Sequence, residues 1–315
     1  MQHSFYKRQK GFTLLELLVV ITLLAVLAVG ALVAYEGVGD QAGATAAANN
    51  TATVDSALRN YKAVTKTYPN QWDNLSASDT GVALASLATP TKSVFGDWAI
   101  GAATAADRTA VVNAFNSVAS NTLMQLQQLT AAAATSAVGS NIAPNLQHNE
   151  GANPNATQDN VSAVTHVSIV PTVAVGGTPA APTSTACTAG TQSISTLYSG
   201  AAADFNAARR LNKINDSLQS DECQLVVALG FGHDAAHSTT DASVAIAQAP
   251  THSSKAINPA KNYARYIALF HMGTDGDANN NITGAEIKAT PHLIAVVDPE
   301  GNPIDVNLMA ANANN

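Results

Sequence analysis

Charged residues are scarce in this chain of 315 residues: Asp, Glu, Lys and Arg make up 12% of it, about half of the roughly 25% typical of soluble domains. Such a composition is unusual for a cytosolic enzyme, because solubility must then rest on Ser, Thr, Asn and Gln. Basic residues are fewer than acidic ones, 15 against 22. The resulting net charge of −7 offers no electrostatic basis for binding nucleic acid, so we expect no nucleic-acid partner.

Aromatic and sulfur chemistry are also sparse. Aromatic side chains make up 5% of the residues, which gives little support to an electron pathway through stacked rings. The two cysteines, Cys187 and Cys223, are not part of a C-x-x-C-H motif, which excludes covalent haem of the c type. The sequence shows no internal repeat of fixed period, so a solenoid is not expected.

A long apolar run near the N-terminus is the most informative feature. The first 11 residues contain basic side chains and no acid, and residues 12–35 follow with Glu16 as their single charge. A helix of that length spans roughly 36 Å at about 1.5 Å per residue, enough to cross a hydrocarbon core about 30 Å thick. The basic residues keep the N-terminal end in the cytoplasm and place the rest of the chain outside.

Glu16 separates three interpretations of this run. An ordinary signal peptide could be cut near Ala28 to Ala31, but its apolar region is usually shorter and needs no carboxylate. A plain membrane anchor would avoid an acid, which costs about 2.5–3.5 kcal/mol at the centre of a membrane helix. The third interpretation uses the charge, because a positive group on a neighbouring subunit, such as a free amine, can offset it.

The heptapeptide KGFTLLE, residues 10–16, resembles the processing site of type IV pilins and type II secretion pseudopilins. The resemblance covers the first 35 residues. It implies that a prepilin peptidase cuts after Gly11 and methylates Phe12, the new N-terminal residue. It also implies that Glu16 pairs with the N-terminal amine of an adjacent subunit when the chain polymerises with copies of itself on an inner-membrane assembly platform.

The same resemblance implies an α+β, type IV pilin-like fold and a structural role, not an enzyme. We expect a cleaved leader at residues 1–11, a membrane and filament-core helix at 12–35, an amphipathic continuation at 36–67 and a globular head at 68–315. The subunit would reside in the inner membrane before assembly and then in an extracellular filament. If the chain is a major or minor pseudopilin, the filament would be periplasmic.

The continuation of the helix has one apolar face that should pack on the head until Pro69 ends the helix. The residues on this face are Val54, Leu58, Tyr61 and Tyr68. Three glycines interrupt the preceding stretch, and each costs about 1 kcal/mol relative to alanine within a helix. Two helices joined at a hinge near residues 37–43 are therefore an alternative.

Periodicity and turn residues predict the main elements of the head. They are a long helix at 105–138, a loop at 140–160, a strand pattern at 161–175, a Gly/Pro/Thr spacer at 176–186, a helix at 201–214, a buried strand at 224–231, a helix at 259–272 and a C-terminal β-hairpin at 293–308 that turns at 299–303.

Cys187 and Cys223 both lie on the exported side, where thiols can oxidise. A disulfide between them would close a loop of about 37 residues and constrain the unfolded chain by roughly 4 kcal/mol. We expect this structural disulfide, with two buried free thiols as the alternative.

Residues 275–286, DGDANNNITGAE, resemble an EF-hand or dockerin-type calcium loop. Their oxygen donors follow the spacing with which such a loop binds Ca²⁺, and the ligands would be Asp275, Asp277, Asn279, Asn281, Thr283 and Glu286. A predicted helix before the loop fits the entering helix. Asn280 occupies the sharp-turn position where glycine is usual, and Pro291 leaves little room for an exiting helix. The alternative is a solvated Asn/Asp loop.

His233 and His237 have the i, i+4 spacing of a zinc-binding helix, but Asp234 stands where a metalloprotease needs its Glu base, and the sequence offers no obvious third ligand. An exposed loop is the favoured interpretation of this segment. A secreted metallohydrolase would depend on these two histidines alone, and a secreted calcium-dependent binding module would require conventional signal cleavage. Both remain distant alternatives to a filament subunit.

Overall fold

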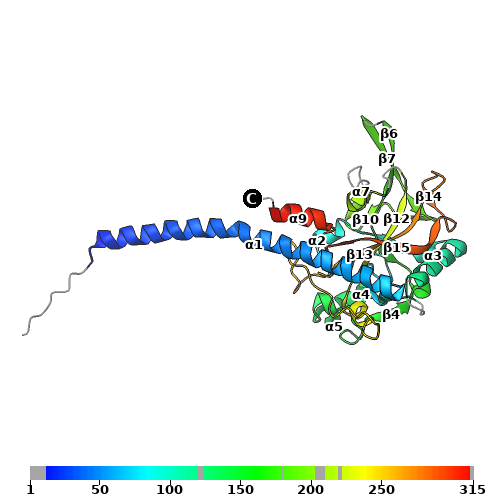
Figure 1. Ribbon diagram of the computed structural model, residues 1–315, viewed down its shortest axis with the longest axis horizontal. Helices are drawn as coiled ribbons and strands as arrows, with labels where there is room; N and C mark the ends of the chain where they lie inside the picture. The colour runs from blue at the N-terminus through cyan, green and yellow to red at the C-terminus, as the bar shows by residue number, and fades with distance from the viewer. Residues whose placement is uncertain (1–11, 120–123, 179, 203–209, 219–221, 313–315) are drawn as a thin grey trace, which may run out of the picture.

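In the computed structural model, which describes residues 12–119, 124–178, 180–202, 210–218 and 222–312, one long helix projects from a globular head (Figure 1). This helix, α1 (Leu14–Thr65), contains 52 residues and is about 78 Å long at 1.5 Å per residue. Lys66 ends it in the left-handed conformation, with φ 69° and its backbone N–H donated to the Lys62 carbonyl. Pro69 lies three residues further on and cannot continue a helix.

The glycines do not divide α1. The helix runs without interruption through residues 37–43, so the alternative of two helices joined there is wrong. Gly39 has open space around it, and a Cβ on Gly43 would lie 3.8 Å from the Ser253 carbonyl oxygen. A few glycines cost little in total, and the alanine-rich sequence around them and the packing of the following turns on the head favour a continuous helix.

The C-terminal half of α1 packs on the head with the face expected from the sequence. Val54, Leu58 and Tyr61 are at most 5% exposed, and Tyr68, just beyond the helix, is also buried and contacts the ring of Phe270 edge to face, with 5.2 Å between centroids. This half of the helix lies against β15 and α9.

The head is built on a ten-stranded, mostly antiparallel sheet with strand order β11-β10-β2-β5-β12-β1-β3-β4, and β13 and β15 continue from β12. Its strands are β1 (Trp72–Asn74), β2 (Gly96–Trp98), β3 (Gln125–Gln128), β4 (Thr157–Asn160), β5 (Val167–Ile169), β10 (Thr196–Leu197), β11 (Gly200–Ala202), β12 (Gln224–Gly230), β13 (Ile267–Thr274) and β15 (Ile287–Val297). Every residue of β12 is buried, which confirms the buried strand expected at 224–231.

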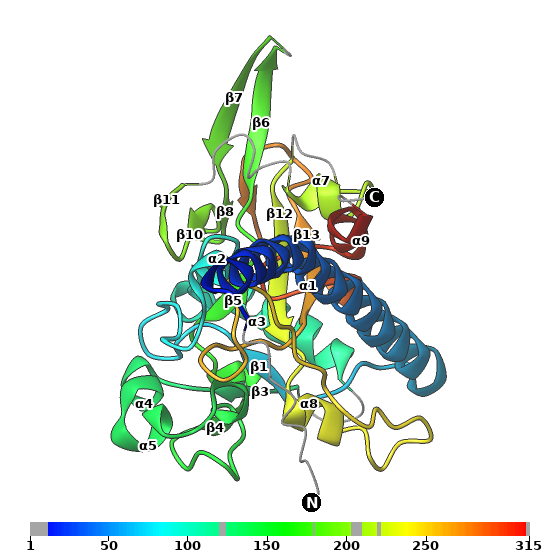
Figure 2. The ribbon, with the colours of Figure 1, turned by 90° about the vertical axis from the view of Figure 1, so that its left-hand side faces the viewer.

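Two smaller sheets and several short helices complete the head (Figure 2). Strands β14 (Asn281–Ile282), β8 (Thr188–Ala189) and β9 (Gln192–Ser193) form one sheet, and β6 (Val173–Thr178) and β7 (Ala181–Ala186) form a projecting hairpin. The remaining helices described are α2 (Thr89–Lys92), α3 (Ala105–Val118), α4 (Ala131–Thr135), α5 (Ala137–Ser140), α7 (Arg210–Ile214), α8 (His233–His237) and α9 (Ile304–Asn312), with single 3₁₀ turns at Ile100–Ala102, Pro144–Leu146 and Val161–Ala163.

The core of the head lies between the sheet and the helices that cover it. Trp72 is fully buried, and its ring contacts those of Phe231 and Phe270 at centroid distances of 5.4 and 5.3 Å. Helix α3 packs on β15 on one side of these rings. Aromatic side chains are few in this chain, but they are concentrated where they bury the most area.

Several of the predicted elements in the head are wrong. The helix expected at 105–138 ends at Val118, because residues 125–128 pair with β1 and β4 as a strand. The spacer at 176–186 is most of the β6–β7 hairpin. Around 201–214, β11 ends at Ala202 and α7 begins at Arg210, and residues 203–209 lie outside the described residues. For residues 125–128 and 176–186, sheet pairing prevails over local propensity.

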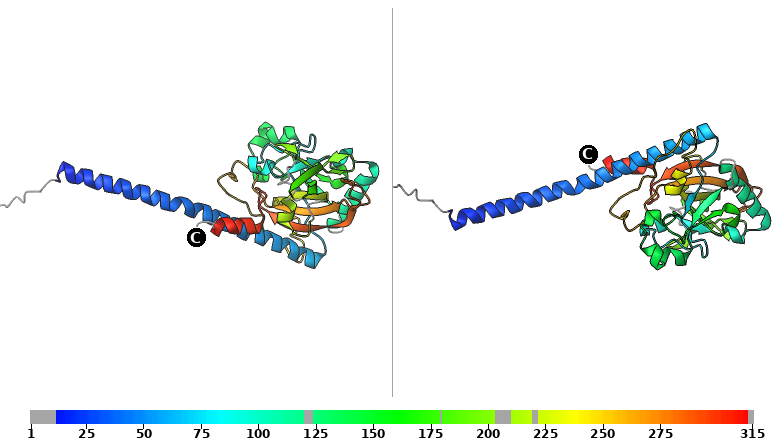
Figure 3. Two further views of the ribbon diagram at one scale, coloured as in Figure 1. Left: turned by 90° about the horizontal axis from the view of Figure 1, so that it is seen from above. Right: turned by 90° about the horizontal axis from the view of Figure 1, so that it is seen from below.

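The C-terminal region differs most from expectation. The helix expected at 259–272 is wrong, because residues 267–274 form β13 between β12 and β15. The C-terminal β-hairpin at 293–308 is also wrong: its first half belongs to β15, but the chain continues from Ile304 as α9, which lies along α1 (Figure 3).

Candidate functional site

The first turn of α1 holds the side chains that the sequence singles out for processing and assembly. Gly11 lies outside the described residues, and Phe12 is 87% exposed. Thr13 is the N-cap, and its Oγ1 accepts the Glu16 backbone N–H at 3.2 Å. In return Glu16 Oε2 accepts the Thr13 N–H at 2.9 Å and the Thr13 hydroxyl at 3.1 Å. This capping box holds the Glu16 carboxylate against the start of the helix, close to Phe12.

The N-terminal half of α1 is apolar and is not covered by the head. The large apolar side chains from Phe12 to Val38 for which exposure is given are all at least 45% exposed. The helix has the length and hydropathy to cross a membrane, and its most apolar window is not buried in the protein at all. An apolar surface of this size does not remain in contact with water, so it requires either a bilayer or other protein chains.

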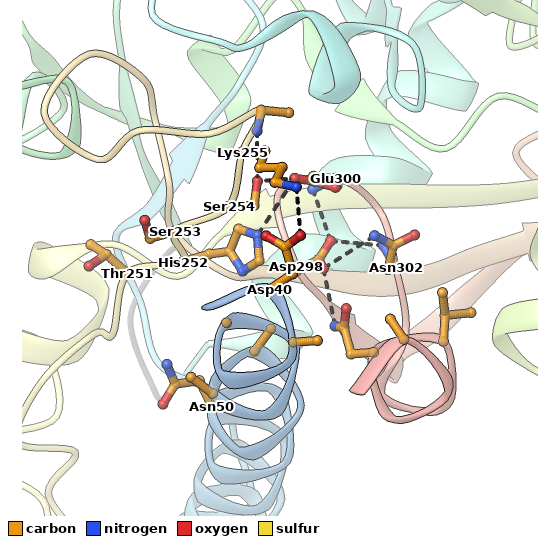
Figure 4. Close-up of a pocket in the computed structure, with 18 of the residues that line it drawn as sticks. Asp40, Asn50, Thr251, His252, Ser253, Ser254, Lys255, Asp298, Glu300 and Asn302 are labelled. Carbon is orange, nitrogen blue, oxygen red and sulfur yellow. Dashed lines mark hydrogen bonds and ion pairs between the residues drawn. The ribbon is translucent and has the colours of Figure 1, made fainter. Parts of the chain in front are cut away.

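The contact between α1 and the head is polar as well as apolar (Figure 4). A groove of about 720 Å³ lies between them, lined by α1, residues 251–256 and the segment from Asp298 into α9. Lys255 Nζ lies 2.6 Å from Asp40 Oδ2 across it, and Glu300 accepts a hydrogen bond from Ser254. The ion pair links α1 directly to the head.

The calcium-like loop runs from the end of β13 to the start of β15 and contains β14, so the entering helix expected before it is wrong. The loop itself is compact: ligand oxygens of Asp275, Asp277 and Glu286 all lie within 4.8 Å of one another. Asn280 has φ 65°, the left-handed conformation for which glycine is usual at that position. Asparagine adopts it more readily than most residues, so the substitution leaves the turn intact.

Backbone donors converge on the carboxylate that ends the loop. Glu286 Oε1 accepts the Gly276 N–H at 2.7 Å, and Oε2 accepts the Thr283 N–H and hydroxyl, each at 2.9 Å. Burial is the largest single influence on the pKa of Glu286 and raises it, but the hydrogen bonds from Thr283 and Gly276 outweigh it and lower the pKa. The carboxylate is therefore held ionised and turned toward the start of the loop.

The middle of the loop is fixed by pairing with β8. The Asn280 carbonyl accepts the Thr188 N–H at 3.0 Å, and the Ile282 carbonyl accepts the Gly190 N–H at 2.8 Å. Successive carbonyls of a strand point to opposite sides, so the Asn281 carbonyl points away from β8. The pairing with β8 therefore leaves this oxygen, the backbone ligand expected at the seventh position of such a loop, unused.

The two cysteines brace this loop. Cys187 and Cys223 form a disulfide with an S–S distance of 2.06 Å and a Cα–Cα distance of 5.7 Å. Cys187 directly precedes β8, and the Cys223 carbonyl accepts the Asp275 N–H at 3.0 Å. The disulfide therefore connects the strand that holds the middle of the loop to the residue at which the loop begins.

Sequence reasoning missed Asp107, which also positions the loop. Its Oδ1 accepts the Gly284 N–H at 2.7 Å, and its Oδ2 accepts the Thr104 hydroxyl at 2.5 Å. Asp107 lies in the first turn of α3, 177 residues away from Gly284 in sequence. The sequence signal was only a Thr-x-x-Asp pattern at a helix start, which does not indicate a distant contact.

The histidine pair does not gather a metal-binding set. His233 and His237 stack with 6.1 Å between ring centroids on α8, and His233 Nδ1 lies 3.0 Å from both Asp234 Oδ1 and Asn149 Nδ2. Within the described part of the chain, the group of three or more His, Cys, Asp or Glu side chains that could hold a metal ion is Asp275, Asp277 and Glu286. The histidines are therefore not joined by a third ligand of these types there.

Comparison with known families gives one match. Residues 6–32 match the prokaryotic N-terminal methylation motif, and comparisons with curated proteins and with solved structures give no match. The long apolar helix contains residues 14–32 of this motif, and the two features together are consistent with a prepilin-like chain of the type IV pilin or pseudopilin kind. The motif implies processing by a peptidase, anchoring in a membrane and later assembly into a filament of many subunits.

Proposed function

We propose that the chain is the structural subunit of a type IV pilus-like extracellular filament and that it has no catalytic role. The observation that supports this most strongly is the methylation motif at residues 6–32, followed by a helix whose apolar half is uncovered while its other half is built into a folded head. Before assembly the bilayer covers the apolar half, and after extraction identical helices replace the lipid. Prepilin peptidase and an inner-membrane assembly platform are the partners of these two steps.

In this proposal Glu16 determines how neighbouring subunits align. Cleavage after Gly11 exposes the amine of Phe12, and the Glu16 carboxylate of an adjacent copy offers the opposite charge. The pair contributes little net stability when buried, but leaving one of the two charges unpaired costs several kcal/mol. Misaligned neighbours are therefore disfavoured.

The experiment that tests this function begins with fibres sheared from cells that express the chain. We expect mass spectrometry to identify this chain as the fibre subunit, beginning with N-methylated Phe12. Glu16→Ala should abolish the fibres without changing the fold of the head, and Glu150→Ala, which removes an exposed glutamate carboxylate of the head, is the control. A native protein that is monomeric in water and begins far downstream of Phe12 would contradict the proposal.

The second candidate function is that of a pseudopilin in a type II secretion system, which shares the motif and the helix. The two differ in where the filament ends. Fibres that extend from the cell surface favour the pilus, whereas a periplasmic filament whose loss stops protein secretion favours the pseudopilin.

We further propose that residues 275–286 bind a structural Ca²⁺ ion. The supporting observations are the three convergent carboxylates, the left-handed Asn280 and the Asn281 carbonyl oxygen, which the pairing with β8 leaves unused. When bound, the ion would neutralise these carboxylates and fix the loop beside the disulfide. Chelation should lower the melting temperature of the purified protein, and added Ca²⁺ but not Mg²⁺ should restore it. An unchanged transition would exclude the metal.

A further inference from the structure

The proposed Ca²⁺ loop takes its ligands from two different sheets. Asp275 directly follows β13, a strand of the ten-stranded sheet, and Glu286 directly precedes β15 of the same sheet. Asn281, the source of the backbone ligand, lies instead on β14, which belongs to the three-stranded sheet β14-β8-β9. A bound ion therefore has to hold parts of both sheets at fixed distances from one another.

The disulfide joins the same two sheets beside the loop. Cys187 directly precedes β8 of the three-stranded sheet, and Cys223 directly precedes β12, every residue of which is buried in the ten-stranded sheet. Among the described strands, none belongs to both sheets. The covalent bond thus ties together two elements that backbone pairing leaves separate.

Hydrogen bonds lead from both ends of the disulfide into the loop. The Cys223 carbonyl accepts the Asp275 N–H at 3.0 Å. Thr188, which follows Cys187, donates its hydroxyl to Asn281 Oδ1 at 2.9 Å, and β8 pairs with β14 in parallel. The disulfide therefore acts on the first ligand of the loop from one side and on its backbone ligand from the other.

We infer that Ca²⁺ binding at residues 275–286 and the Cys187–Cys223 disulfide are energetically coupled, so that each strengthens the other. The inference rests on the proposed Ca²⁺ site. Whichever of the two forms first fixes the two sheets relative to one another, and the second then loses less conformational freedom when it forms. Such a coupling is reciprocal: the factor by which the disulfide raises the affinity for Ca²⁺ is also the factor by which Ca²⁺ disfavours reduction of the disulfide.

A disulfide that only stabilises the fold would behave differently. It would constrain the unfolded chain and leave the affinity of the folded loop for Ca²⁺ unchanged. The dependence of this affinity on the disulfide therefore separates the two roles. The loop lies at the end of the head away from the uncovered half of α1 (Figure 1), so the full-length protein can be studied with detergent covering that half.

The first experiment measures the affinity for Ca²⁺ by titration calorimetry of the full-length protein in a neutral detergent. We expect Cys187→Ser/Cys223→Ser to bind Ca²⁺ at least about fivefold more weakly than the oxidised wild type, the lower end of typical couplings between two sites. Leu84→Ala is the matched control. Leu84 is 1% exposed and belongs to a different hydrophobic cluster from the cysteines and Ile282 of the loop, so its truncation lowers stability without changing the affinity.

The second experiment uses the wild type and does not require the double variant to fold. Dithiothreitol gives up two electrons and two protons as it forms its cyclic disulfide, and the protein disulfide takes them up as two thiols. The reduced fraction is measured by alkylation and mass spectrometry over a series of ratios of reduced to oxidised dithiothreitol. Because both cysteines are fully buried, equilibrium is approached from the oxidised and from the reduced protein.

We expect Ca²⁺, but not Mg²⁺, to raise the ratio needed for half-reduction by the same factor, about fivefold or more. Glu286→Gln, which weakens the site, should abolish this shift.

The outcomes separate the coupling from the site. Equal Ca²⁺ affinities of wild type and double variant, or a half-reduction ratio that Ca²⁺ does not change although the wild type binds the ion, would overturn the coupling and leave the proposed site intact. Weakening by Leu84→Ala to the extent seen without the disulfide would reduce the effect to general stability and overturn the coupling as well. If the wild type itself binds no Ca²⁺ at millimolar concentrations, both the site and the coupling are wrong.

Discussion

Asp97 allows a quantitative test of how the head is stabilised. It lies on β2, where its Oδ1 accepts the Ser76 hydroxyl at 2.5 Å. Burial raises the pKa of this carboxyl from 3.8 to about 6, although the hydrogen bond from Ser76 and the nearby His166 oppose the shift. The folded protein therefore holds the proton more tightly than the unfolded chain does.

The sign and size of the effect follow from this shift. A folded-state pKa above the unfolded value contributes stability that is fully present below about pH 4 and is lost as pH rises through about 6. A difference of about two units corresponds to about 3 kcal/mol, at 1.36 kcal/mol per unit. Burial likewise raises the pKa of Asp73 and Asp298. The pKa of Glu286 is lowered, so its contribution to the free energy of unfolding increases as pH rises.

Because several carboxylates contribute, the informative quantity is the difference between wild type and Asp97→Asn. We expect the free energy of unfolding of the wild type, relative to the variant, to fall by about 2.4 kcal/mol between pH 4 and pH 7. Urea unfolding of the full-length protein in a neutral detergent would measure it through the fluorescence of Trp72 and Trp98, which are fully buried. Asp216→Asn, at an exposed site, is the control. Parallel pH profiles for wild type and Asp97→Asn would refute the reasoning.

Three further predictions concern the core, the disulfide and the loop. Leu58→Ala, at a position with no exposed surface, should cost about 2–5 kcal/mol of unfolding free energy, and Val64→Ala, at an exposed position on the same helix, should cost far less. Replacing both cysteines with serine should lower stability by roughly 4 kcal/mol, and reduction of the wild type should reproduce that loss. Glu286→Gln should abolish the rise in melting temperature caused by Ca²⁺, measured by calorimetry, and a rise equal to that of the wild type would place the ion elsewhere.

The N-terminal region could be predicted because its signals are local and strong. A run such as residues 12–35 fits few structures other than a membrane-length helix, and its processing motif is contiguous. The buried strand at 224–231 could be predicted for a similar reason, since it is a short apolar run between polar segments. The spacing of the calcium-like loop is also local. Its support by Asp107 and by the Cys187–Cys223 disulfide depends on contacts between distant segments, and the sequence did not indicate how these segments meet around the loop.

Other elements were ambiguous because a short apolar run fits more than one structure. Tyr263, Tyr266, Ile267 and Phe270 have a helical spacing, but all four are buried around β13, a strand covered on both faces. A strand buried on both sides loses the alternation of apolar and polar residues that would identify it. Only the neighbouring strands β12 and β15, which supply its hydrogen bonds, determine the outcome.

The C-terminal region was ambiguous for a similar reason, although the position of its turn, at residues 299–303, was predicted correctly. The backbone reverses at residues 299–303: Gly301 has φ 80°, and its N–H is donated to the Asp298 carbonyl at 2.9 Å. A Cβ on Gly301 would overlap a methyl group of Val94, so glycine is required there.

These local interactions reverse the chain but do not determine the secondary structure of the residues after the turn. Among the described strands β15 pairs with β13 alone, but Arg59 donates to the Ile294 carbonyl and the Tyr68 hydroxyl accepts the Leu293 N–H, and α1 offers a surface along which a helix can pack. The turn therefore leads into α9, which packs along α1 instead of adding a strand to the sheet.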